Sequence, residues 1–138
     1  MAAGIWTLTD LNILPPEAKH TAEFVSKIDQ LFDCFNCSSL SHANPRRRGL
    51  QEKNQEETLQ FLNDTKAWLN TVKCKTGTDL PCIEGWKMNI EALKVLWKDQ
   101  QEAGAESLFT RRLNQDLLEH FFGCIRGKGG HLVRYKGY

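Results

Sequence analysis

The sequence predicts an all-α fold, and three observations lead to that prediction. Apolar residues recur at steps of three and four residues in four segments, as they do on helices with one buried face. No segment shows a convincing alternation of apolar and polar residues, as a half-buried strand does. Stretches rich in proline, glycine and serine separate the segments. The 138 residues suffice for one small domain with one hydrophobic core.

The first predicted helix runs from about Pro16 to Asn36. A proline in the first turn of a helix loses no hydrogen bond, so Pro16 marks a start. The apolar stripe of this helix consists of Ala22, Val25, Ile28, Leu31, Phe32 and Phe35. After a polar loop, the second helix is predicted from about Gln55 to Val72. Its apolar face consists of Leu59, Leu62, Ala67, Leu69 and Val72.

The third predicted helix runs from about Gly85 to Glu102, after a break that contains Gly77 and Pro81. Its apolar residues are Trp86, Ile90, Leu93, Leu96 and Trp97. A short link separates it from the fourth predicted helix, which runs from about Gln115 to Arg126. The apolar residues of the fourth helix are Leu117, Leu118, Phe121, Phe122 and Ile125.

Charge and hydropathy exclude several classes of protein. The formal net charge is +1, so no overall electrostatic field favours a nucleic acid or a membrane surface as partner. No apolar run reaches the roughly 18 residues of a membrane span. The segment from Met1 to Asp10 carries no basic leader, so we expect no secretory signal.

The five cysteines are an odd number, which fits free thiols in a reducing compartment. Cys34 and Cys37 form a C-x-x-C pair, a spacing that zinc and redox sites use. A zinc site requires a second pair of ligands, and Cys74 and Cys82 do not have a similar spacing. We therefore favour two small, buried or half-buried side chains on one helix.

Two pairs of polar residues are candidate sites. Asp33 and Asn36 could read the edge of a base, with the carboxylate accepting from ring N–H groups, or they could form the polar end of an amphipathic helix. Asp116 and Glu119 share a helix face and could form half of a magnesium site. They could also be an acidic first turn that complements the helix dipole. Spacing alone favours the structural interpretation in both cases.

Basic residues gather at two places. Arg46, Arg47 and Arg48 could contact phosphates, although a solvated loop is the default interpretation. The stretch RGKGG could wrap a phosphate with its backbone N–H groups and Lys128, and a flexible helix exit explains it as well. The sequence contains neither a P-loop nor a G-x-G-x-x-G motif. Residue patterns alone thus predict a helical protein with two acid-bearing candidate sites.

Four stretches, in this order and spacing, resemble the C-terminal half of the P-element-type DNA transposases, whose domesticated relatives carry an N-terminal THAP zinc finger. The stretches are TAEFVSKIDQLFDCFN, FLNDTKAWLNTV, CIEGWKMNIEALKVLW and FTRRLNQDLLEHFFGCIRGKGG. The resemblance covers about Gly4 to Gly130, and its most specific part is LNQDLLEHFFGCIRGKGG.

The resemblance implies two parts. Residues 1–107 would belong to a helical, GTP-binding insertion domain, and residues 108–138 to a returning segment of an RNase H-like catalytic domain. In the insertion domain, Asp33 and Asn36 match residues that contact the nucleotide, and Phe32 neighbours the base. Glu119 matches the last acid of the catalytic metal site, and Asp116 is expected near the nucleotide or the metal.

The resemblance also implies GTP and Mg²⁺ as cofactors, transposon-end DNA as partner, self-association and a nuclear location. It does not imply a membrane. The family's DNA-binding regions, the strands that carry two catalytic aspartates and the earlier part of the nucleotide pocket have no counterpart in these residues. We therefore expect a fragment or relic of a transposase that is inactive alone. The alternative is a domesticated, non-enzymatic helical interaction module.

Overall fold

The computed structural model describes residues 1–73 and 80–128, apart from the side chains of residues 116, 117 and 128. It confirms the all-α prediction. The helices are α1 (Ala2–Asp10), α2 (Ala18–Phe35), α3 (Gln55–Leu69), α4 (Pro81–Glu102) and α5 (Asp116–Lys128). Short 3-10 turns are η1 (Pro45–Arg47), η2 (Glu52–Asn54) and η3 (Thr110–Leu113), and two-residue strands are β1 (Leu50–Gln51) and β2 (Ser107–Leu108).

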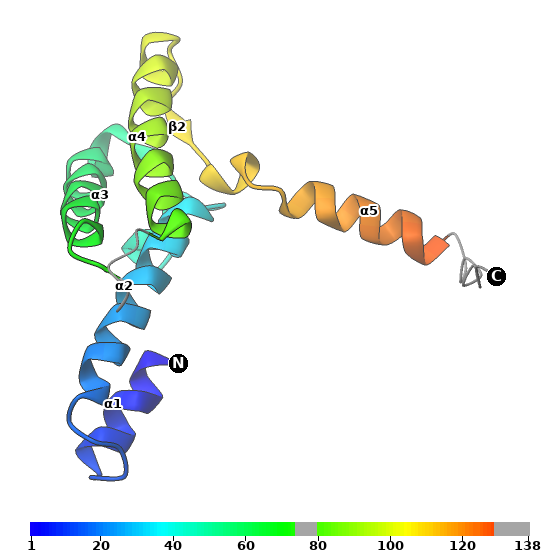
Figure 1. Cartoon of the computed structure of the whole chain (residues 1–138). Coiled ribbons are helices and arrows are strands. Elements are labelled where there is room, and N and C mark those ends of the chain that lie inside the picture. Colours follow the sequence, from blue (N-terminus) through cyan, green and yellow to red (C-terminus); the bar gives the residue numbers. More distant parts are fainter. Residues whose placement is uncertain (74–79, 129–138) are drawn as a thin grey trace.

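Three of the helices form a body from which the other two extend. α2, α3 and α4, which we call the helical body, pack around one core, and α1 folds back along the N-terminal half of α2 (Figure 1). α5 projects away from the helical body to the right in Figure 1, whereas α1 lies at the lower end of the molecule. The chain therefore presents its last described helix as an arm.

The core lies where the three helices of the body meet. Its largest fully buried apolar side chains are Leu31, Leu62, Leu69, Ile90 and Trp97. All five belong to the apolar faces that the sequence predicted, so the interior follows from helical periodicity. The indole Nε1 of Trp97 donates to Gln55 Oε1 at 3.0 Å, which satisfies the polar atom of the buried ring.

A glycine turn at the end of α4 returns the chain to the body. Gly104 has a φ of +83°, and the next amide, of Ala105, donates to the carbonyl of Gln100 at 2.8 Å. This is the Schellman pattern that ends many helices. The returning β2 then pairs antiparallel with β1. Gly49 precedes β1, and a Cβ there would lie 3.0 Å from the carbonyl oxygen of Leu108, so the close approach favours glycine.

The predicted elements differ from the observed ones in a few places. α1 was not predicted, because Gly4 and two threonines blur its apolar face and only Thr9 is buried. α4 begins at Pro81, four residues before the predicted start at Gly85, so the proline belongs to the first turn of the helix and not to the break before it. The β1–β2 pair was also not predicted. Each strand has only two residues, which is too few to show an alternation of apolar and polar residues.

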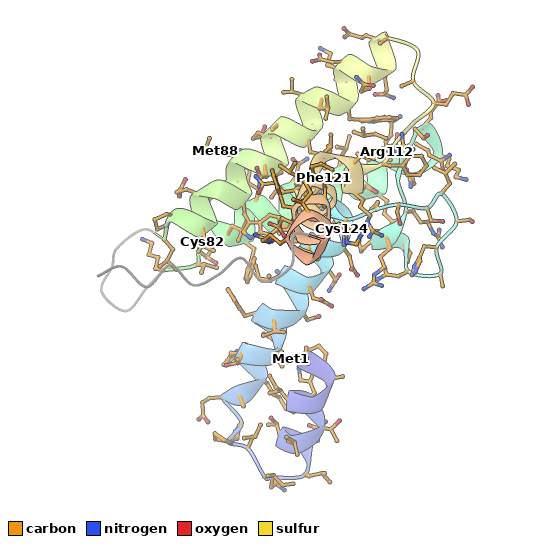
Figure 2. All side chains as sticks on the ribbon, turned by 90° about the vertical axis from the view of Figure 1, so that its right-hand side faces the viewer. Met1, Cys82, Met88, Arg112, Phe121 and Cys124 are labelled. Atoms are coloured by element: carbon orange, nitrogen blue, oxygen red, sulfur yellow. The ribbon has the colours of Figure 1, made fainter. Side chains whose placement is uncertain are left out.

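The arm α5 carries its apolar residues in the open. The half-exposed ones are Leu118, Phe121, Phe122 and Ile125. Figure 2 looks towards the end of α5, on which Phe121 and Cys124 are labelled, with Cys82 and Met88 on α4 behind it. Among the described residues, no helix combines the length and the apolar character that crossing a membrane requires.

Candidate functional site

A cavity of about 310 Å³ lies at the C-terminal end of α2. Its lining consists of Asp29, Phe32, Asp33, Asn36, Ser38, Ser39, His42, Arg47 and Arg111. Three residues that the sequence singled out, Phe32, Asp33 and Asn36, therefore line one cavity. They meet because a helix places residues three and four apart on one face. The ring of Phe32 is 51% exposed and the carboxylate-bearing Asp33 is only 6% exposed.

The loop that follows α2 holds the carboxylate of Asp33. Its Oδ1 accepts from Nε of Arg47 at 2.8 Å, and its Oδ2 accepts from Nδ2 of Asn44 at 3.0 Å. A buried carboxylate requires partners of this kind, because removing it from water is costly. Asn44 also accepts at Oδ1 from the amide of Arg46 at 2.9 Å, which fixes the start of η1. Asp33 is thus held between a charged and a neutral donor.

The sequence did not indicate that Arg47 and Asn44 are partners of Asp33. The sequence nevertheless contains a hint of this pairing. A buried acid on an apolar helix face requires a cationic partner, and three consecutive arginines follow in the next loop. The three arginines of that run take different partners. Arg46 lies 4.0 Å from the ring centroid of Phe61, while Nε of Arg48 donates to the carbonyl of His42 at 2.6 Å. They are therefore not a merely solvated cluster.

Asn36 links the end of α2 to the segment that precedes α5. Its side-chain Oδ1 accepts from Nδ2 of Asn114 at 3.2 Å. Next to it, the amide of Arg111 donates to the carbonyl of Cys37 at 3.1 Å. Sequence analysis did not place Asn114 or Arg111 near this site. The cavity is therefore built from α2, the loop after it and η3, which lie far apart in the sequence.

Beside this cavity, a buried hydroxyl joins two backbone groups. Thr110 is 2% exposed, and its Oγ1 donates to the carbonyl of Cys34 at 2.7 Å. The same oxygen accepts from the amide of Cys37 at 3.0 Å. η3 is in this way fastened to the last turn of α2.

The two cysteines of the C-x-x-C pair are both buried, with Cys34 on α2 and Cys37 just beyond its end. Burial, and next the neighbouring Cys37, raise the pKa of the Cys34 thiol to about 12. Burial also raises the pKa of Cys37. Both thiols therefore stay protonated at neutral pH. Among the described residues, no group of three or more His, Cys, Asp or Glu side chains is placed to hold a metal ion.

A second, more apolar cavity of about 410 Å³ lies on the other side of Phe32. Its lining includes Phe35 and Trp86, whose rings meet edge to face at 5.4 Å, and Leu113. Phe32 lines both cavities. An aromatic ring in that position can offer its face to a flat, apolar group.

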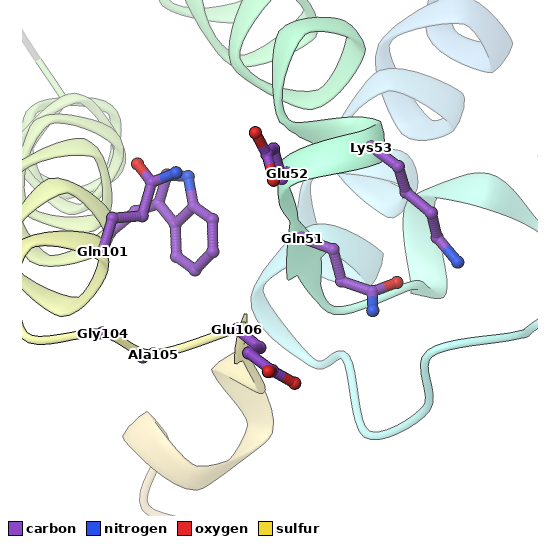
Figure 3. A pocket seen from close by; sticks show the side chains of 8 residues that line it. Gln51, Glu52, Lys53, Gln101, Gly104, Ala105 and Glu106 are labelled. Atoms are coloured by element: carbon purple, nitrogen blue, oxygen red, sulfur yellow. The ribbon is translucent and has the colours of Figure 1, made fainter.

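A wider cavity of about 730 Å³ opens between the end of α4 and η2. Figure 3 shows its lining, which includes Gln51, Lys53, Gln101 and Glu106. None of the candidate site residues that the sequence singled out lines it, although Trp97 of the core does. Its mixed amide and charged lining shows no arrangement of an acid, a base and a nucleophile, so we do not assign chemistry to it.

Glu119 lies on α5, apart from the lining of the Asp33 cavity. Its side chain is exposed, and its amide donates to the carbonyl of Gln115 at 2.9 Å. Asp116 is the first residue of α5, and its side chain lies outside what the structure describes. The same holds for the side chain of Lys128 and for the glycines after it. The expected roles of Glu119, Asp116 and the RGKGG stretch stay predictions.

The predicted division of the chain at residue 107 also stays a prediction. In the structure, β2 (Ser107–Leu108) runs across this position and pairs with β1. η3 follows it and is fastened to α2 through Thr110. The segment before α5 is therefore packed on the helical body.

Comparison with known proteins gives two matches and one negative result. No profile of a known protein family matches the chain. The chain is 34% identical over 118 residues to the transposable element P transposase of Drosophila melanogaster, across 82% of this chain and 15% of that protein. Its fold is similar to a chain of the Drosophila P element transposase strand transfer complex, with a TM-score of 0.78 and 28% identity. That match covers 94% of this chain and 29% of the other, so this chain spans a minor part of both proteins.

Proposed function

Because the chain belongs to the P-element-type transposase family, we propose that it is a segment of such a transposase that binds GTP and carries one acid of the catalytic metal site. The observation that carries the proposal is the buried carboxylate of Asp33 beside the half-exposed ring of Phe32 in one cavity. An aromatic face next to a fixed acceptor pair suits a purine base.

The chemistry of Asp33 favours guanine over adenine. Guanine presents two adjacent donors, the ring N1–H and the exocyclic amino group, and a carboxylate accepts at both oxygens. Each oxygen of Asp33 accepts one described hydrogen bond, from Arg47 or Asn44, and has about two acceptor positions. Arg47 therefore need not leave when a base binds. Adenine presents an acceptor at ring N1, which would face the carboxylate unfavourably.

Arg47 and Arg111 line the same cavity and would serve the phosphates. The side chain of Arg47 is 51% exposed, so part of its guanidinium can take an anion while Nε stays on Asp33. Charge-assisted hydrogen bonds from arginine to phosphate are among the stronger polar contacts in proteins.

Titration of the 138-residue chain with GTP and ATP by calorimetry tests this proposal. We expect GTP to bind in preference to ATP. Asp33→Asn should weaken GTP binding by about ten- to a hundredfold, because a carboxylate–guanine contact contributes roughly 1.5–3 kcal/mol. Asp29→Asn removes the same charge from the lining of the same cavity and should leave the preference intact. No binding at about 1 mM GTP, or an unchanged GTP preference in Asp33→Asn, would reject the proposal.

We further propose that Glu119 supplies one carboxylate to a Mg²⁺ site. Its exposed position on the projecting α5 leaves it open to ligands from another domain. Among the described side chains, which do not include that of Asp116, no cluster of acids accompanies Glu119, so we expect the remaining ligands to come from another domain. In such transposases, a bound Mg²⁺ would supply Lewis-acid chemistry for phosphodiester attack, and Glu119 would hold it.

On these grounds we expect no cleavage or joining of transposon-end DNA by this chain alone in magnesium or manganese. A nuclear location and self-association follow from the family and are part of the same proposal. Cleavage that Glu119→Gln abolishes would overturn the expectation, because it would mean that this chain alone assembles a working metal site.

The exposed apolar face of α5 favours a second candidate, a non-enzymatic interaction module. Its half-exposed residues are Leu118, Phe121, Phe122 and Ile125. If the chain is a segment of a transposase, this face would pack on the sheet of the catalytic domain. If it is an interaction module, the face would bind another protein. GTP binding that depends on Asp33 would distinguish the two candidate functions. An interaction module without transposase activity has no need to keep a GTP site.

A further inference from the structure

α5 carries a pair of metal-ligating side chains that the proposed function does not use. His120 and Cys124 are one helical turn apart, and both are exposed. Nε2 of His120 and Sγ of Cys124 lie 3.7 Å from each other. At about 100° per residue, they occupy the flank of the helix away from Glu119. A ligand there would not compete with the proposed role of Glu119.

The separation of the two atoms matches the edge of a zinc tetrahedron. Zinc binds a histidine nitrogen at about 2.0–2.1 Å and a cysteine sulfur at about 2.3 Å. At the tetrahedral angle these bond lengths place the two donor atoms about 3.6 Å apart. The observed 3.7 Å between Nε2 and Sγ therefore requires almost no movement of either side chain. The helix itself supplies the preorganisation.

We propose that His120 and Cys124 form half of a zinc site, which a second copy of this chain completes. A closed tetrahedral site requires four ligands, and among the side chains that the structure describes, which do not include that of Asp116, no third histidine, cysteine or acid joins this pair. The projecting position of α5 leaves room for another helix (Figure 1). Two α5 helices related by an antiparallel two-fold axis bring His120 of one copy level with Cys124 of the other.

This arrangement gathers two imidazoles and two thiolates around one point, the His₂Cys₂ set of structural zinc sites. Each Cys124 thiol loses its proton to solvent when it binds, so one Zn²⁺ replaces two protons. Isologous contacts of this kind are the commonest way in which soluble chains pair. The metal would therefore act as a clamp between two copies.

The test is a titration of the full 138-residue chain with Zn²⁺ or Co²⁺ in a non-thiol reductant. Light scattering measures the mass, and the absorption of Co²⁺ reports tetrahedral geometry and thiolate ligation. We expect one metal ion per two chains, a dimer that a chelator dissolves, and a thiolate-to-cobalt absorption band. Cys124→Ser and His120→Asn should each weaken metal binding on the order of 100-fold or more. Loss of a residue that only hydrogen-bonds to a metal ligand already lowers metal affinity about ten- to a hundredfold, and loss of the ligand itself should cost at least as much.

Matched controls separate this site from other exposed ligands. Cys82→Ser and His20→Asn remove an exposed cysteine on α4 and an exposed histidine on α2, and both should bind and dimerise like the parent chain. A monomer at saturating zinc, one ion per single chain, or unchanged binding in Cys124→Ser would each overturn the proposal. So would a loss of binding in Cys82→Ser.

Discussion

The hydroxyl of Thr110 offers the sharpest test of how the arm α5 is joined to the helical body. This side chain is 2% exposed, and its oxygen bridges the carbonyl of Cys34 at 2.7 Å and the amide of Cys37 at 3.0 Å. Valine has nearly the same shape but neither donates nor accepts. Thr110→Val therefore removes both hydrogen bonds without opening a cavity.

The cost follows from what is left unpaired. The carbonyl of Cys34 keeps a second contact, from Sγ of Cys37 at 3.3 Å, whereas the amide of Cys37 loses its partner. Two lost hydrogen bonds contribute about 1 kcal/mol each, and an unsatisfied buried amide adds about 1–3 kcal/mol. We expect Thr110→Val to lower the free energy of unfolding by about 3–5 kcal/mol, out of a total of roughly 5–15 kcal/mol for a domain of this size.

Urea unfolding followed by circular dichroism measures the loss. Thr110→Ser keeps the hydroxyl and removes one methyl group, so it should cost only about 1 kcal/mol. Thr71→Val is the matched control: its Oγ1 donates to the carbonyl of Trp68 at 2.7 Å at the surface, and its loss should change stability by no more than about 0.5 kcal/mol. If Thr110→Val proved as stable as Thr110→Ser, the hydroxyl would not be what fastens η3 to α2.

Three further predictions concern the same free energy of unfolding. The pKa of Cys34 is raised from 9.0 to about 12 in the folded chain, so above pH 9 only the unfolded state loses this proton. Stability should then fall by up to about 1.4 kcal/mol per pH unit, and urea midpoints of Cys34→Ala across this range should fall less steeply. Hydrogen bonds from Lys66, and next from Lys94, lower the pKa of Glu91 in the folded chain. The contribution of Glu91 to stability should therefore be present above pH 4.5, its ordinary pKa, and be lost as the pH falls through its pKa in the folded chain. Stability measured against acid pH should lack this small decrease in Glu91→Gln. Leu62→Ala, at a fully buried position, should cost about 2–5 kcal/mol in thermal or urea unfolding, whereas Leu118→Ala on the exposed α5 should cost about 0.5 kcal/mol or less.

Much of the helical body could be predicted, because its packing follows one local rule. Leu31, Leu62, Ile90 and Trp97 each belong to an apolar stripe at helical spacing on their own helix, and all of them are buried in the structure. α1 escaped prediction because its stability comes from lying along α2 rather than from an apolar face of its own. The β1–β2 pair joins residues that are distant in sequence, and no local sequence pattern predicts such a contact.

The candidate site could be predicted only in part, for the same reason. Phe32, Asp33 and Asn36 share the last turns of α2, so their spacing alone brings them together. Arg47 and Arg111 come from a loop and from η3, whose paths depend on packing. The burial of an acid indicates that a cation is near, but not which of several arginines it is.

Residues at the end of α2 line the cavity that contains Asp33, and they also contact the segment that leads into α5. Asn36 lines that cavity and bonds to Asn114, which lies two residues before α5 begins. Arg111 lines it as well, and its amide is held by the carbonyl of Cys37. Both residues thus join the helical body to the segment that precedes α5, so we expect a change at either one to alter the position of Glu119. Stability measurements on the Thr110 joint therefore bear on the placement of that acid as well as on the fold.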